Sequence, residues 1–143
     1  MWTRSWKLLK KPAAFLEQIN MDELYQQHIL DHAGNPRFKG VLSLCDAEGR
    51  AENPSCGDWG VMYLKEENGH VVAGFDGGGC AISQAGLSLL TESIQGKTLN
   101  ELRLLTPGDI YTMLGIEISP ARVNCALLGY KALETALKHL KHE

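Results

Sequence analysis

Three cysteines are the residues of this 143-residue chain best suited to metal or sulfur chemistry. Cys56 lies in the segment 53–58, Cys80 follows three consecutive glycines, and Cys125 lies near the C-terminal end of the chain. They are far apart in the sequence, so only folding can bring them together. Three cysteine sulfurs and the carboxylate of Asp58 form a four-ligand set for a tetrahedral metal such as zinc.

The sequence around each cysteine favours a thiolate. Cys80 precedes a predicted helix, whose free backbone N–H groups and dipole favour an anion. Cys125 is predicted in the second turn of a long helix that opens at Ser119-Pro120, and we expect its thiol to be exposed. Arg122 lies three residues earlier and therefore on nearly the same helix face, where it could lower the pKa of the thiol or steady a bound sulfane group. The alternative is a surface arginine without either role.

Simpler explanations exist for each of these residues. A cysteine alone is often a small buried hydrophobic residue, and Asp58 alone could be a turn residue or a cap. Glycines 77–79 could cradle a phosphate, but no Walker lysine follows them, and they are better explained as a backbone that bends close to a metal. Cys45 lies outside the three cysteine segments, and we predict that it is a spare thiol and not a ligand.

The elements that would position the cysteines follow from the hydrophobic pattern. Residues 58–65 and 71–75 alternate apolar and polar side chains around Asn68-Gly69, a strong β-hairpin signature. Because the outer ends of a hairpin meet opposite its turn, we expect Cys56 and Cys80 to emerge side by side.

The remaining segments indicate an α+β fold, a small antiparallel sheet covered by helices with the metal site at one end. Residues 37–52 are predicted to be a loop. Helices are predicted over residues 22–33, 82–94, 99–105, 109–114 and 120–140.

Two histidines, His28 and His32, lie four residues apart on the first predicted helix. This spacing could place two imidazoles on one metal ion. Because no third ligand lies nearby in the sequence, we expect them to be packed or solvated instead.

Composition limits the class of protein. The chain is 44% hydrophobic and 22% charged, which suits one core, and no apolar run is long enough for a membrane span. Four cysteines without a signal peptide are typical of a reducing cytosol, where thiols serve metals or catalysis. We therefore expect a cytoplasmic protein.

Charge separates an N-terminal segment from the rest. Residues 1–20 contain four lysines and arginines and one glutamate, so they carry +3, and residues 21–143 carry −6 of the net −3. The first segment is predicted to be a basic amphipathic extension, which could touch a membrane surface or a partner, and the second a single domain. A net acidic domain argues against nucleic-acid binding.

Three motifs resemble the U-type iron–sulfur assembly proteins, the family of IscU, the N-terminal domain of NifU, and SufU. The motifs are 53–58 (NPSCGD), 79–85 (GCAISQA) and 120–125 (PARVNC), and residues 25–40 resemble the N-terminal helix and turn of the family. The resemblance covers about Met21 to His139 and implies a SufE/NifU-like fold.

The resemblance also implies a function. A cysteine desulfurase of the SufS or IscS type would deliver persulfide sulfur to the protein, which would pass it to downstream iron–sulfur assembly proteins. Zinc would be held by Cys56, Asp58, Cys80 and Cys125. Cys125, beside Arg122, would leave the metal and accept the sulfur by thiol exchange.

Two departures leave the branch of the family open. IscU-like scaffolds have a histidine ligand before the last cysteine, where this chain has Asn124. SufU-like proteins share the other motifs but carry an insertion before the last motif, which this chain lacks. The favoured hypothesis is a SufU-like, zinc-dependent sulfurtransferase. The alternatives are a scaffold on which iron is assembled into a [2Fe–2S] cluster at Cys56, Cys80 and Cys125, and a zinc-stabilised interaction module.

Overall fold

The computed structural model of the chain describes residues 21–42 and 44–140. The basic extension predicted over residues 1–20 lies outside this part. Elements follow in the order α3 (Met21–Gly34), β1 (Ala47–Asn53), β2 (Asp58–Glu67), β3 (His70–Gly78), α4 (Ala81–Ile94), α5 (Leu99–Arg103), α6 (Pro107–Leu114), η1 (Pro120–Arg122), α7 (Val123–Ala126) and α8 (Leu128–Leu140). None of the helices described is long and apolar enough to cross a membrane.

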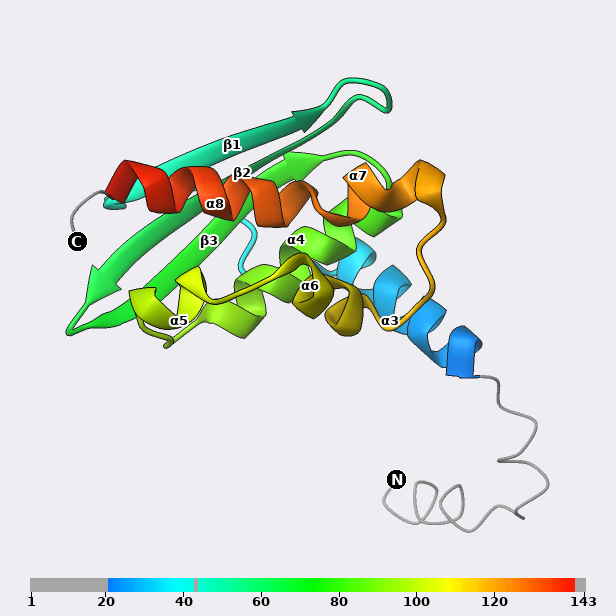
Figure 1. The fold of residues 1–143 in the computed structure, drawn as a ribbon, viewed down its shortest axis with the longest axis horizontal. Coiled ribbons are helices and arrows are strands. Elements are labelled where there is room, and N and C mark those ends of the chain that lie inside the picture. Colours follow the sequence, from blue (N-terminus) through cyan, green and yellow to red (C-terminus); the bar gives the residue numbers. More distant parts are fainter. Residues whose placement is uncertain (1–20, 43, 141–143) are drawn as a thin grey trace, which may run out of the picture.

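The three strands form one antiparallel sheet in the order β1-β2-β3. The predicted hairpin is confirmed as β2 and β3. Its turn residues Asn68 and Gly69 have φ values of 55° and 82°, as a two-residue type I′ turn requires. All described helices of the core pack on one face of the sheet, so the α+β prediction is confirmed (Figure 1).

Strand β1 corrects the prediction that residues 37–52 are a loop. Its residues alternate small and charged side chains and include no bulky apolar residue, so the sequence shows little strand propensity. The structure explains the small residues, because α8 lies directly on β1. A Cβ atom at Gly49 would clash with the backbone of Ala132 and Ala136. Because α8 packs so closely, position 49 requires glycine, although glycine has a low propensity for β-strands.

Helix α4 lies at the centre of the molecule and packs against β3, α3, α6 and α8. The largest fully buried side chains around it include Leu87, Leu90, Met62 and Phe75. Burying each of them stabilises the fold by about 1.5–3 kcal/mol relative to an exposed side chain. The buried side chains on β2, β3 and α4 thus fix the elements that flank Cys56 and Cys80.

The long helix predicted over residues 120–140 is broken in the structure. A 3₁₀ turn and the one-turn helix α7 precede α8, and the chain leaves helical geometry at Leu127, with φ −95° and ψ 5°. Cys125 therefore lies on a separate single turn of helix.

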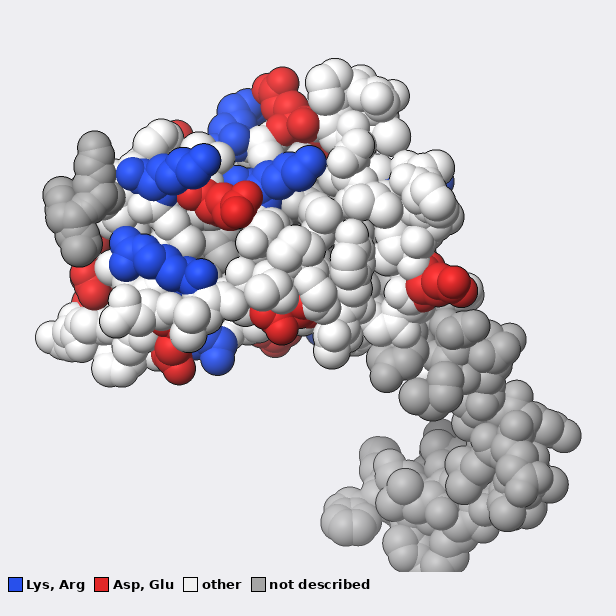
Figure 2. All heavy atoms as spheres, in the orientation of Figure 1, with Lys and Arg blue, Asp and Glu red and all other residues white. Residues whose placement is uncertain are grey.

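Charged side chains of both signs are interspersed over α8, β1 and α5 on the face shown in Figure 2. On this face, few charged side chains lie at the end of the molecule formed by α7 and the loop between β1 and β2. That loop, residues 54–57, contains no charged residue.

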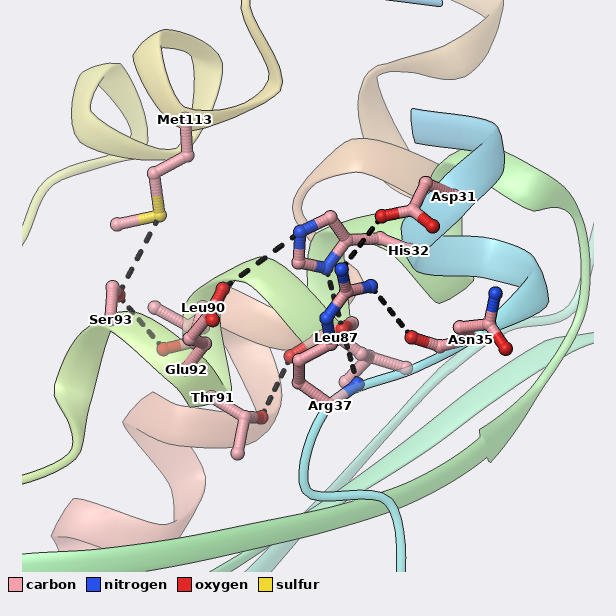
Figure 3. Close-up of polar contacts among 11 residues, drawn as sticks. Asp31, His32, Asn35, Arg37, Leu87, Leu90, Thr91, Glu92, Ser93 and Met113 are labelled. Carbon is pink, nitrogen blue, oxygen red and sulfur yellow. Dashed lines mark hydrogen bonds and ion pairs between the residues drawn. The ribbon is translucent and has the colours of Figure 1, made fainter. Parts of the chain in front are cut away.

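Helix α3 is joined to α4 by a small polar cluster, the α3–α4 junction, formed by His32, Arg37, Ser88 and Glu92 (Figure 3). The Nδ1 atom of His32 lies 2.8 Å from the Ser88 hydroxyl, which also accepts the backbone N–H of Arg37 at 2.8 Å. The Nε2 atom of His32 lies 3.8 Å from the Glu92 carboxylate. The prediction for the histidines is confirmed, because His32 is packed and His28 is exposed.

Candidate metal centre

Three loops and turns meet at one end of the sheet (Figure 1). The β1–β2 loop carries Cys56, β2 opens with Asp58, the residue before α4 is Cys80, and α7 carries Cys125. The hairpin thus brings its two outer ends together, as predicted, and α7 closes the site from the helical side.

The four side chains predicted as metal ligands form one cluster. Ligand atoms of Cys56, Asp58 and Cys125 all lie within 4.8 Å of one another, and the two sulfurs are 3.9 Å apart. Cys80 is not in that group of three, but its sulfur lies 3.8 Å from the Oδ2 atom of Asp58.

These distances fit a tetrahedral zinc ion. Zinc–sulfur bonds are about 2.3 Å long, so two sulfurs at a tetrahedral angle lie roughly 3.8 Å apart. Cysteine sulfurs and carboxylate oxygens are both among the ligands that zinc takes in proteins. Cys56, Asp58 and Cys125 therefore fit a zinc ion as they lie, and Cys80, beside Asp58, stays the predicted fourth ligand.

Asp58 joins two parts of the cluster. It is 2% exposed and pairs with Asn53 across β1 and β2. Its Oδ1 atom accepts the backbone N–H of Cys80 at 3.1 Å, while its Oδ2 atom faces the Cys80 sulfur. The Oδ1 atom thus holds the backbone of the loop that carries Cys80. The Oδ2 atom faces the Cys80 sulfur, where it could bind a metal ion.

The glycines before Cys80 are required by this close approach. Gly79 has φ +142°, and a Cβ atom there would clash with the Asp58 carboxylate. The amide of Gln84, oriented with its oxygen toward the loop, accepts the N–H groups of Gly78 at 3.1 Å and Gly79 at 3.3 Å. Gly79 therefore serves close approach of the backbone to Asp58, and the predicted approach to a metal stays a prediction.

Ser83 and Gln84 are site residues that sequence reasoning missed. Ser83 is fully buried; its hydroxyl donates to the Cys80 carbonyl at 2.9 Å and lies 3.7 Å from the Cys80 sulfur. Both residues lie in the first turn after Cys80, three and four positions on. Polar side chains at these positions are typical of groups that satisfy free backbone atoms at a helix start.

The Cys80 thiol is the more acidic of the two perturbed thiols. Burial raises its pKa, but the hydrogen bonds from the backbone and side chain of Ser83 outweigh burial, so the pKa is lowered overall. The Cys80 thiol therefore loses its proton more readily than an ordinary cysteine thiol.

Cys125 corrects two expectations. Its thiol is fully buried and not exposed. Burial, followed by the hydrogen bonds that the thiol makes to Asp58 and Cys80, raises its pKa to about 12. Arg122 does not reverse this effect, because its side chain is exposed and solvent screens its charge. The negative sulfurs of Cys80 and Cys125 do raise the pKa of Arg122, which shows that it lies near both.

Cys56 is the exposed thiol of the three. Gly57, the residue after it, has φ +73°, and no atom lies within 4 Å of the position that a Cβ atom would take there, so this loop projects into open space. Cys45 lies just before β1, at the other end of that strand from Cys56. A seven-residue strand is about 20 Å long, which keeps Cys45 away from the site.

The fold is that of a known family. Residues 24–143 match the model of the NifU-like N terminal domain. The chain therefore belongs to this family, and the resemblance found in the sequence is confirmed.

Two characterised relatives show the range of the family. The zinc-dependent sulfurtransferase SufU of Bacillus subtilis is 37% identical over 137 residues. The alignment covers 80% of this chain and 90% of SufU. The iron–sulfur cluster assembly scaffold protein IscU of Thermotoga maritima is 36% identical over 134 residues, covering 82% of this chain and 94% of that protein.

Solved structures agree with the fold. A crystal structure of an iron–sulfur cluster assembly scaffold protein for the SUF system, from Fervidobacterium islandicum AW-1, superposes with a TM-score of 0.67 at 30% identity, covering 82% of this chain and 99% of that one. The N-terminal part of a NifU-like protein from Brucella abortus gives 0.68 at 25% identity, with 84% and 96% covered.

Proposed function

We propose that the protein serves iron–sulfur cluster assembly as a zinc-dependent acceptor of persulfide sulfur from a cysteine desulfurase. The cluster of Cys56, Asp58 and Cys125, with the Cys80 sulfur 3.8 Å from Asp58, carries this proposal. Relatives named as a zinc-dependent sulfurtransferase and as cluster scaffolds support it. Bound zinc would supply a positive charge that keeps the buried thiols deprotonated and holds the three loops together.

The chemistry is thiol exchange. A thiolate of the site attacks the outer sulfur of the donor's cysteine persulfide, a sulfur–sulfur bond forms, and the bond inside the donor persulfide breaks. The donor cysteine leaves as a thiolate, and the acceptor becomes a persulfide. No oxidant or reductant is needed, because one sulfur–sulfur bond replaces another.

Two thiols are candidates for the acceptor. The sequence predicts Cys125, with Arg122 beside it as a helper, and that assignment stays a prediction. Its burial weighs against it, because the sulfur of a donor must approach the acceptor directly. Cys56 is exposed on an uncharged loop, so it is the thiol that a donor reaches first, and we favour it.

The alternative function is a scaffold on which a [2Fe–2S] cluster is assembled by the same cysteines. Similar identity to scaffold proteins supports it. Asn124 weighs against it, because it replaces the histidine of the IscU-like motif. Its side chain is exposed and accepts a hydrogen bond from Lys131 at 3.4 Å. A zinc-stabilised interaction module explains the ligands but gives no role to the exposed thiol of Cys56.

The test combines metal analysis with sulfur mapping. Protein purified without oxygen should be colourless and contain one zinc ion; a brown protein containing iron would favour the scaffold. Wild-type, Cys56→Ser and Cys125→Ser proteins are then incubated with a cysteine desulfurase and cysteine, alkylated and digested. Mass spectrometry should find the added sulfur on Cys56, and Cys56→Ser should accept none. Sulfur on Cys125, retained in Cys56→Ser, would restore the original assignment.

A further inference from the structure

The side chain of Asn53 lies against the sulfur of the most buried cysteine. Its Nδ2 atom is 3.6 Å from the Cys125 Sγ atom, within the range for a hydrogen bond to sulfur. Asn53 is 6% exposed, although it is the last residue of β1, where the chain turns into the Cys56 loop. A buried amide needs a partner for its N–H groups, and the sulfur provides one.

The strand register explains why this residue reaches the site. Asn53 is paired with Asp58 across β1 and β2, so the two side chains lie on the same face of the sheet, toward Cys125. The backbone carbonyl of Asn53 also accepts the N–H of Cys56 at 3.1 Å. One residue therefore contacts two of the cysteines, the exposed one through its backbone and the buried one through its amide.

The negative charge of the ligand set explains what this N–H contact contributes. Three thiolates and one carboxylate carry four negative charges, whereas a zinc ion carries two positive charges. In a buried site, an N–H donor directed at a ligand sulfur offsets part of the excess negative charge and fixes the orientation of the ligand. Asp58 and the other cysteines are themselves acidic groups that add negative charge. They cannot supply an N–H donor to the sulfur.

We propose that Asn53 is a positioning residue whose amide N–H donates to the Cys125 sulfur and makes Cys125 the fixed ligand of the metal centre. This inference rests on the proposed zinc site. It assigns the cysteines different tasks: Cys125 stays on the metal, held by Asn53, while exposed Cys56, which receives no side-chain N–H donor among the contacts described, is the ligand free to exchange.

The test uses cobalt(II) bound in place of zinc, because the absorption of cobalt reports on its sulfur ligands. Asn53→Asp keeps the shape of the side chain but replaces the donor by a carboxylate. Asn124→Asp makes the same chemical change next to the same cysteine, on a side chain that is exposed and contacts Lys131. The second variant therefore controls for added charge near the site.

In Asn53→Asp, the sulfur-to-cobalt charge-transfer band should move to longer wavelength, because the sulfur lone pairs lose a stabilising N–H. Zinc affinity, measured by competition with a chelating dye, should fall by about 10-fold or more. Asn124→Asp should keep the wild-type band and affinity. A role of Asn53 in the turn alone would change the melting temperature but leave the band in place.

Matching bands and affinities in the two variants would overturn this inference and leave the proposed function intact. A wild-type protein that takes up neither cobalt nor zinc would overturn both. If Asn53→Asp does not fold, Asn53→Ala, which removes the donor without adding charge, is judged by the same band and affinity.

Discussion

Two buried polar clusters lie against helix α4 and differ in how their groups are satisfied. At the α3–α4 junction, His32 has a hydrogen-bond partner in Ser88 and an acidic neighbour in Glu92, and Ser88 also holds the backbone of the α3 loop. At the candidate metal centre, acidic groups face one another: the Cys125 thiol is buried beside Asp58 and two further cysteines, and its burial, followed by these neighbours, raises its pKa.

This difference indicates a structural role for the α3–α4 junction and a chemical role for the cysteine cluster. A cluster whose donors and acceptors match is stable as it is and ties two helices together. A buried cluster of groups that can each lose a proton becomes favourable when a cation binds, and the protons then leave. Both clusters lie against the same helix, so it is the side chains from the other elements that decide their roles.

Removal of the metal should have the largest effect. Chelation of zinc should lower the melting temperature by roughly 10 °C or more, because several kcal/mol of metal binding is coupled to folding and 1 kcal/mol corresponds to about 2–4 °C in a domain near this size. Cys80→Ser should melt like the chelated protein and bind little zinc. Differential scanning calorimetry of loaded and stripped protein checks this. An unchanged melting curve after complete metal removal would refute the coupling.

Gly79→Ala should damage the metal centre without changing a ligand. The added methyl group would meet the Asp58 carboxylate, so zinc affinity should fall by about 10–100-fold, as when outer contacts of a metal ligand are lost. Gly57→Ala is the matched control: it also has positive φ, but open space surrounds its Cβ position. Equal zinc affinities for the two variants would show that the Asp58 contact is unimportant.

The α3–α4 junction should make stability depend on pH. Burial, with the charges of Arg37 and His28, lowers the pKa of His32 below its ordinary 6.5, against the opposing effect of Glu92 and Asp31. His32 therefore binds a proton more readily in the unfolded chain than in the folded one. Its contribution to the free energy of unfolding is full above pH 6.5 and is lost as the pH falls through the lower, folded-state pKa.

The measurement compares wild-type and His32→Gln melting temperatures from about pH 7.5 to about pH 5. The wild type should lose more stability than the variant over this range, while both keep one zinc ion at the upper end. The metal centre titrates alike in both proteins, so the difference reports His32. Parallel curves would mean that His32 does not titrate on folding.

The smallest effect should come from the exposed ion pair at the edge of the junction. Arg37 and Asp31 are 2.7 Å apart, but half of the Asp31 side chain is exposed, and solvent screens such a pair. Asp31→Asn should therefore leave the melting temperature and zinc content unchanged within error. A clear loss of stability would show that this exposed pair holds the segment after α3 despite solvent screening.

The sequence alone determined the hairpin and the α+β class, and it predicted the candidate ligands. Asn68-Gly69 predicts the turn because both residues tolerate positive φ, and the turn places the ends that carry Cys56 and Cys80 next to each other. The three cysteine motifs identified the family because each is local. Such features depend on neighbouring residues only, so they can be recognised before the fold is known.

Tertiary structure decided what depends on distant partners. Strand β1 has no strand-like composition, because α8 requires small residues on it. The exposure of Cys125 could not be deduced from its position in a helix, since burial depends on which elements cover the helix. For the same reason, the contact of Asn53 with Cys125 appears only when the sheet and α7 meet at one end of the molecule.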